Sequence, residues 1–154
     1  MSTGDGGQHV EVVVNHVGLC VTDLDRSRRF YEDVLGFVFD RELRPPDDAT
    51  APLLSLDPPL NVTAVYLTLG PFVLELLHFD RPGGPEARTR QFDEPGLTHL
   101  SFSVEELDAA IALVPERGGQ VVSNVMGAFV IRDPDGQLLE LLPMAYHRRL
   151  QQGS

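Results

Sequence analysis

Apolar residues recur along the chain with two periods, one typical of strands and one typical of helices. Residues 10–21 are apolar and β-branched, which predicts a strand. Behind it, apolar residues fall near helical spacing over 22–35. Thr22 or Asp23 can cap that helix, and Gly36 stands where a helix ends in a left-handed residue. Three further strands are predicted over 37–43, 61–69 and 72–79.

The second half of the chain repeats this order. A stretch rich in proline, glycine and charge covers 80–95, after which the pattern restarts with a strand over 97–104. A helix follows over 105–119 and ends at a glycine pair. Three strands complete the repeat, over 120–123, 127–133 and 137–142. The chain is therefore predicted to be an internal repeat of strand, helix and three strands.

These elements predict one α+β domain built from two βαβββ modules. Residues 44–60 contain five prolines and are predicted to be a loop, which could form a lid together with the linker. The predicted parts are a flexible start 1–9, a first module 10–79, a linker 80–95, a second module 96–143 and a tail 144–154.

Composition narrows the class of protein. The length of 154 residues suits one domain, and the net charge of −11 argues against a general binder of nucleic-acid phosphates. No apolar run approaches the roughly 18 residues that a membrane span needs. The absence of a secretory signal pattern and the single cysteine favour a reducing, cytoplasmic location.

Two histidines and two glutamates occupy matching places in the two modules. His16 and His99 lie on the first predicted strand of each module, and Glu75 and Glu140 lie on the last. The separations, 59 residues from His16 to Glu75 and 41 from His99 to Glu140, differ by 18. That difference is close to the length of the proline-rich insertion.

Strand alternation places each glutamate on a face with apolar neighbours. A carboxylate there is costly unless it is paired, hydrogen-bonded or bound to a metal. Nitrogen and oxygen ligands suit divalent zinc, iron, cobalt, nickel or manganese, and the absence of thiolate ligands argues against a structural zinc site. The sequence therefore predicts one divalent metal ion held by four residues, His16, Glu75, His99 and Glu140.

A lone histidine on a strand is more often an ordinary core or surface residue, so this prediction depends on the four matching places. His78 lies three residues after Glu75 and is predicted to face the opposite way. His9 and His147 are predicted to be solvated. Cys20 shares the face of His16 and is predicted to be a small buried residue.

Three stretches resemble one known family. NHVGLCVTDLDRSRRFYEDVLGF resembles the first βα unit of the vicinal oxygen chelate superfamily, also called the glyoxalase, bleomycin resistance and dioxygenase superfamily. GLTHLSFSVEELDAAI resembles its second unit, and IRDPDGQLLELLP resembles its closing hairpin. The resemblance covers about residues 10–143. It implies mixed sheets curled into a cup with helices outside, and a homodimer, in some members with modules exchanged between chains.

The ligand set is most similar to the glyoxalase I-like branch, in which a glutamate on the fourth strand, here Glu75, joins a His, His, Glu triad. The resemblance implies a metal-dependent lyase or isomerase that transfers a proton alpha to a metal-bound carbonyl through an enediolate. Glu140 would be the base and Glu75 the second carboxylate. The substrate would be a small carbonyl compound or a thiol adduct.

Other functions remain open at this point. A natural-product or antibiotic resistance protein of this fold would bind its ligand without metal. A methylmalonyl-CoA epimerase-like enzyme would return the proton to the same carbon. An iron(II) extradiol dioxygenase is disfavoured because Glu75 would occupy a position that oxygen and substrate need. Five arginines near the predicted loops are predicted to be mostly solvated surface charge rather than substrate anchors: Arg41, Arg44, Arg81, Arg88 and Arg90.

Overall fold

The computed structural model describes residues 10–82, 84 and 86–153, so the predicted flexible start 1–9 lies outside the described residues. The first half contains β1 (Val17–Cys20), α1 (Leu24–Leu35), β2 (Val38–Leu43), α2 (Asp47–Leu54), β3 (Val62–Leu69) and β4 (Phe72–Phe79). The second half contains β5 (His99–Val104), α3 (Leu107–Glu116), β6 (Gln120–Val125), β7 (Ala128–Arg132), β8 (Leu138–Pro143) and α4 (Met144–Gln152).

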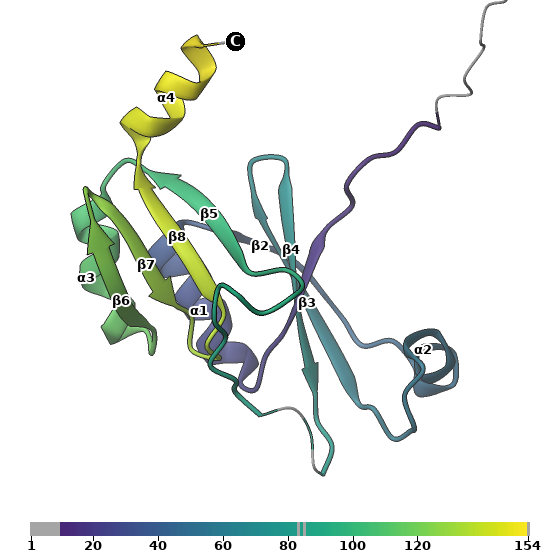
Figure 1. Cartoon of the computed structure of the whole chain (residues 1–154). Coiled ribbons are helices and arrows are strands. Elements are labelled where there is room, and N and C mark those ends of the chain that lie inside the picture. The colour runs from purple at the N-terminus through teal and green to yellow at the C-terminus, as the bar shows by residue number, and fades with distance from the viewer. Residues whose placement is uncertain (1–9, 83, 85, 154) are drawn as a thin grey trace, which may run out of the picture.

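The strands form two separate four-stranded mixed sheets with the same topology. The first sheet has the order β1-β4-β3-β2, and the second has the order β5-β8-β7-β6 (Figure 1). In each sheet the first strand pairs parallel with the last, and the other pairings are antiparallel. The predicted α+β class and the paired modules are confirmed. Within this chain, however, the two sheets do not close into a single cup.

Helix α1 begins and ends as its sequence dictates. The Asp23 carboxylate accepts a hydrogen bond from the backbone N–H of Arg26, which caps the first turn. Gly36 ends the helix in the left-handed region at φ 74°. Phe30, Tyr31 and Val34 are buried along one face of the helix. This face fixes the helix against the first sheet and against the neighbouring helix α3.

The first strand is much shorter than predicted. Residues 10–16 are not in a strand, and His16 lies immediately before β1 rather than within it. The register explains this difference, because Val17 pairs with Leu74 and β4 begins only two residues earlier, at Phe72. Residues before Asn15 therefore extend past the end of the strand that would pair with them.

Two segments predicted to lack secondary structure contain helices. In 44–60, helix α2 starts behind Pro46, and its first turn carries Asp47 and Asp48, which the helix dipole favours. The Asp47 carboxylate also accepts the backbone N–H groups of Leu60 and Asn61, at 2.7 and 3.2 Å. These bonds tie the helix to the start of β3. In the predicted tail, α4 projects beyond the end of β8 (Figure 1).

One hydrophobic core joins the two modules. It contains buried residues from both sheets and from α1 and α3, among them Phe30, Tyr31, Val114 and Leu139. Three phenylalanine rings extend this contact, with the Phe102 ring of β5 5.9 and 6.4 Å from the rings of Phe37 and Phe72. The modules therefore pack together through their helices and strand ends. Among the described residues, no helix is long and apolar enough to cross a membrane.

A buried carboxylate also connects the modules. Asp133, only 3% exposed, follows β7 and accepts a hydrogen bond of 2.8 Å from the Tyr31 hydroxyl of α1. It also accepts the backbone N–H groups of Asp135 and Gln137. Burial raises the pKa of Asp133 although these three bonds act to lower it. The side chain thus fixes the β7–β8 turn and holds that turn against α1.

Two replacements of Asp133 are expected to distinguish the effect of its hydrogen bonds on stability from the effect of its charge. Asp133→Ala leaves three buried donors unpaired and should cost about 2–4 kcal/mol of unfolding free energy, whereas Asp133→Asn keeps an acceptor oxygen and should cost less. Because the pKa of Asp133 is raised in the folded state, the side chain binds its proton at a higher pH in the folded state than in the unfolded state. Its contribution to stability therefore increases on acidification from neutral pH, and Asp133→Asn should lose that increase. Urea unfolding at several pH values measures both effects. If the unfolding free energy changes equally with pH in wild type and in Asp133→Asn, the prediction about pH is wrong.

Candidate functional site

The first half-site lies at the start of β1, on the open face of the first sheet. The Nε2 atom of His16 is 3.2 Å from Oε2 of Glu75 on β4. The other carboxylate oxygen of Glu75 accepts a 2.6 Å hydrogen bond from the Tyr66 hydroxyl on β3. That hydrogen bond raises the pKa of Tyr66, so the phenol stays a donor at neutral pH. The Glu75 carboxylate is thus held from two sides.

Glycine at position 18 keeps this half-site open. Gly18 pairs with Glu75 across β1 and β4, and a Cβ there would lie 3.3 Å from Oε2 of Glu75. Asn15 orients the His16 ring, because its Oδ1 lies 2.7 Å from Nδ1 of His16. This contact leaves Nε2 of the ring facing the Glu75 carboxylate.

The second half-site lies at the start of β5, on the second sheet. The Ser101 hydroxyl donates a 2.7 Å hydrogen bond to Oε1 of Glu140 on β8. His99 is the first residue of β5, and its Nδ1 lies 2.8 Å from the Thr98 hydroxyl. The Phe92 ring packs against the His99 imidazole with a centroid distance of 5.0 Å. His99 and Glu140 therefore have local partners that differ from those of the first half-site.

Strand register shows that the two half-sites occupy equivalent positions. Gly18 pairs with Glu75, and Ser101 pairs with Glu140. Each histidine lies two residues before the residue that pairs with the glutamate, at His16 and His99. The edge strands β2 and β6 also match. The pairing of β2 with β3 has a register shift at Phe39/Arg41, and the pairing of β6 with β7 has one at Val121/Ser123. The predicted correspondence between the halves is therefore present at the level of single residues.

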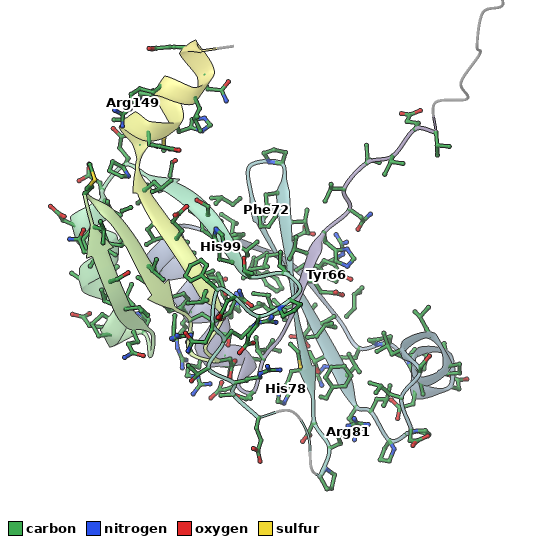
Figure 2. All side chains as sticks on the ribbon, in the orientation of Figure 1. Tyr66, Phe72, His78, Arg81, His99 and Arg149 are labelled. Atoms are coloured by element: carbon green, nitrogen blue, oxygen red, sulfur yellow. The ribbon has the colours of Figure 1, made fainter. Side chains whose placement is uncertain are left out.

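A single chain does not bring the four predicted ligands together. Among the described residues, no group of three or more His, Cys, Asp or Glu side chains is placed to hold a metal ion. His16 is close to Glu75, whereas His99 belongs to the other sheet. In Figure 2, His99 lies on β5 and Tyr66 on β3, on the separate sheets of the two halves. The chain thus presents two half-sites, each on an open sheet face.

The other singled-out histidines are not part of either half-site. Nδ1 of His78 lies 3.1 Å from the carbonyl oxygen of Val21, so the His78 ring ties β4 to the end of β1. His147 lies on the exposed helix α4, and His9 lies outside the described residues. Cys20 is exposed, so the prediction of a buried small residue is wrong. Among the described residues β1 pairs with β4 alone, so Cys20 belongs to an edge strand of the first sheet.

The arginines differ in placement. Arg41 lies on β2, and its guanidinium is 4.4 Å from the centre of the Tyr66 ring. It also forms an ion pair with Asp40 at 2.6 Å. The other four contact local partners: Arg44 with Glu42, Arg81 with the Asp57 carbonyl, and Arg88 and Arg90 with Glu94. Arg41 is therefore the arginine in contact with the first half-site.

Sequence reasoning missed Tyr66 and Phe92. Tyr66 stands opposite Glu75 across the β3–β4 pairing, a relation that becomes readable once the tight turn at Gly70 sets the register. Phe92 lies in the linker, and the chain pattern gives no signal that its ring contacts His99. Both are aromatic residues beside a predicted metal ligand.

Comparison with known proteins identifies the class. The model of the Glyoxalase/Bleomycin resistance protein/Dioxygenase superfamily matches residues 13–141, and the chain belongs to this superfamily. It is 32% identical to the protein YaeR of Escherichia coli, over 83% of this chain and 93% of that protein. It is 30% identical to an ethylmalonyl-CoA/methylmalonyl-CoA epimerase of Cereibacter sphaeroides, over 72% of this chain and 75% of the epimerase.

Solved structures of other proteins superpose on the fold of this chain. The glyoxalase I of Leishmania major, described as trypanothione-dependent, superposes with a TM-score of 0.65 at 25% identity, covering 90% of this chain and 91% of that enzyme. Divalent metals occur within this fold, since the structure of a FosX fosfomycin resistance protein from Listeria monocytogenes contains Mn(II). At 15% identity, that structure supports the fold alone.

Proposed function

We propose that this chain is a metal-dependent lyase or isomerase of the glyoxalase I-like type, which moves a proton alpha to the carbonyl of a small substrate. The observation that carries the proposal is the residue-level equivalence of the His16–Glu75 and His99–Glu140 half-sites. The four side chains would hold one divalent ion, with one half-site from each chain of a homodimer. The open sheets and the separation of the half-sites within one chain support this arrangement.

The chemistry of the first half-site suits a divalent cation. Nε2 of His16 and Oε2 of Glu75 are both electron-pair donors and lie only 3.2 Å apart. A divalent cation at this place would be coordinated by an imidazole nitrogen and a carboxylate oxygen, a ligand pair suited to nickel, cobalt, zinc, manganese or iron. Asn15 would act as the outer partner that fixes the imidazole tautomer.

The two glutamates are held differently, and this supports different roles. A bound divalent ion would polarise the substrate carbonyl and make the adjacent C–H group more acidic. Among the residues that the structure describes, Glu140 accepts one side-chain hydrogen bond, from Ser101, and is the better candidate for the base that moves to take the proton. Glu75 is held by both Tyr66 and His16, so it is the better positioned ligand.

Epimerisation of an acyl thioester is the second candidate, favoured by the 30% identity to the ethylmalonyl-CoA/methylmalonyl-CoA epimerase. The same two carboxylates would serve it, with one removing the proton and the other returning it to the same carbon on the opposite face. A thiohemiacetal of an α-ketoaldehyde and a short branched acyl thioester are therefore the two substrates to compare. A metal-free ligand-binding protein is the non-enzymatic alternative.

Elemental analysis of protein purified without chelator tests the metal. Wild type is expected to hold about one divalent ion per chain, and His99→Ala should lower this occupancy by at least about tenfold. His147→Ala is the matched control, because His147 is exposed on α4 and should keep full occupancy. Full occupancy in His99→Ala would contradict the ligand assignment. A wild type that takes up no ion on dialysis against the five candidate metals would favour the ligand-binding protein.

A further inference from the structure

A row of paired residues crosses the first sheet at the half-site. Glu75 pairs with Gly18 of β1 on one side and with Tyr66 of β3 on the other. Tyr66 in turn pairs with Arg41 of the edge strand β2. Directly opposite residues on neighbouring strands project from the same face of a sheet. The face that presents the Glu75 carboxylate therefore also presents a cation, two strands away.

Side-chain contacts connect this cation to the predicted metal ligands. The Arg41 guanidinium is 4.4 Å from the centre of the Tyr66 ring, and that ring packs edge-on against the His16 imidazole at a centroid distance of 5.7 Å. The Tyr66 hydroxyl reaches Glu75 through its hydrogen bond. Neighbouring strands lie about 4.8 Å apart, so the Arg41 and Glu75 backbones are roughly 10 Å apart. One small molecule is long enough to contact both side chains.

The equivalent row of the second sheet has a different chemistry. Glu140 pairs with Val130 of β7, and Val130 pairs with Ser123 of β6. Val130 thus stands where the first sheet has Tyr66, and Ser123 stands where it has Arg41. Neither Val130 nor Ser123 carries a charge. The repeated architecture therefore does not require an arginine at this place, and Arg41 makes the two sides of the site unlike.

The Arg41 guanidinium has donors to offer to a further anion. Its Nη1 atom donates a 2.6 Å hydrogen bond to Asp40, and no other hydrogen bond from this guanidinium is found in the described part of the chain. The two side chains are 56% and 42% exposed, and an exposed ion pair contributes little to stability. Stacking on Tyr66 orients the guanidinium plane without using any of its five N–H groups. An incoming anion can therefore bind the remaining donors or displace Asp40.

We propose that Arg41 is the anchor of an anion subsite, so that the substrate carries a carboxylate or phosphate several bonds from its reacting carbonyl. The position of that carbonyl, at an ion held by His16 and Glu75, rests on the proposed function. The anionic end of the substrate lies over the first sheet, and its uncharged part lies toward the second sheet, where Val130 replaces Tyr66. This difference between the sheets fixes which way round the substrate binds.

Calorimetric titration of the full chain with three matched ketones tests the subsite. The probes 6-oxoheptanoate, its methyl ester and 5-oxohexyl phosphate share a methyl ketone and a spacer of four methylene groups, and differ in the end group. At least one anionic ketone should bind at least about tenfold more tightly than the ester, because only an anion forms charge-assisted hydrogen bonds with Arg41. The anion with the larger ratio identifies the class. Arg41→Ser, which installs the residue found at the equivalent place in the second sheet, should reduce this ratio to about one.

Two further variants separate charge from packing. Arg41→Lys keeps the charge and should keep a preference for the anion of at least about threefold. Arg44→Ser removes a neighbouring arginine that pairs with Glu42, and should keep the full wild-type ratio. Equal binding of the three ketones to wild type, binding of none of them, or a preference that survives Arg41→Ser would overturn the subsite. Equal losses in Arg41→Lys and Arg41→Ser would assign Arg41 to packing on Tyr66 and would also overturn it.

Elemental analysis of the same wild-type samples keeps this result apart from the proposed function. A protein that takes up no divalent ion, yet prefers an anionic ketone through Arg41, would overturn the proposed function and keep the subsite. A metal-loaded protein that binds the ester as tightly as both anions would overturn the subsite and leave the proposed function standing. A metal-loaded protein whose preference for the anion depends on Arg41 supports both.

Discussion

Combining His16→Ala chains with His99→Ala chains in one dimer is expected to restore a working site that neither variant has alone. If each site takes one half from each chain, one site of the mixed dimer loses both histidines and the other keeps both. Mixed dimers isolated through two different affinity tags should then hold about half the metal of wild type and show about half its turnover. The two homodimers should hold almost none.

The same experiment separates this arrangement from a site built within one chain. In that case each chain of the mixed dimer lacks one ligand, and metal content and turnover should stay at the level of the homodimers. Pairing His16→Ala with Glu75→Ala is the matched control, because both changes affect the same half-site. Every site in that mixed dimer lacks one ligand of the first half, so recovery there would contradict the assignment of His16 and Glu75 as ligands.

The sequence predicted the correspondence between the halves because it depends on local pattern. Strand alternation and the repeated order of elements were enough to place His16, Glu75, His99 and Glu140 in matching positions, and the pairings of Gly18 with Glu75 and Ser101 with Glu140 agree. The helix limits were equally local, since Asp23 and Gly36 set them through one cap and one left-handed residue.

What could not be predicted depends on where strands end and which strands are neighbours. The valines of residues 10–14 have the composition of a strand, but the chain's own β4 begins too late to pair with them. The proline-rich segment 44–60 was expected to be a loop, whereas Pro46 and Asp47 start a helix there. Tyr66 acts on Glu75 across two strands, a contact fixed by register rather than by nearby sequence.

The geometry also explains why the net charge of the whole chain is a poor guide to the substrate. The chain carries a net charge of −11, yet Arg41 lies on β2 over the Tyr66 ring, beside the first half-site. Its ion pair with Asp40 offsets part of that positive charge. The local charge at the half-site therefore differs from the charge of the whole chain, and only the fold places these residues together.

Glu140→Gln is expected to lower turnover by about 10²–10⁴-fold while keeping much of the bound metal, because the amide oxygen still coordinates but the side chain no longer accepts a proton. Glu75→Gln should act more strongly on metal content, because Glu75 is held between Tyr66 and His16 and its negative charge would attract a divalent cation. Elemental analysis and steady-state turnover of the two variants measure these two effects separately.

Exchange of the substrate α-hydrogen with deuterium from solvent then distinguishes the two candidate reactions. If Glu140 alone shuttles the proton between neighbouring carbons, Glu140→Gln abolishes exchange and product formation together. If Glu75 returns the proton to the opposite face of the same carbon, metal-loaded Glu75→Gln should still exchange the α-hydrogen of one stereoisomer of an acyl thioester without inverting it. Tyr66→Phe, which removes the hydrogen bond to Glu75 but no carboxylate, is the control for loss of positioning. Unchanged turnover in Glu140→Gln would exclude Glu140 as the base in either reaction.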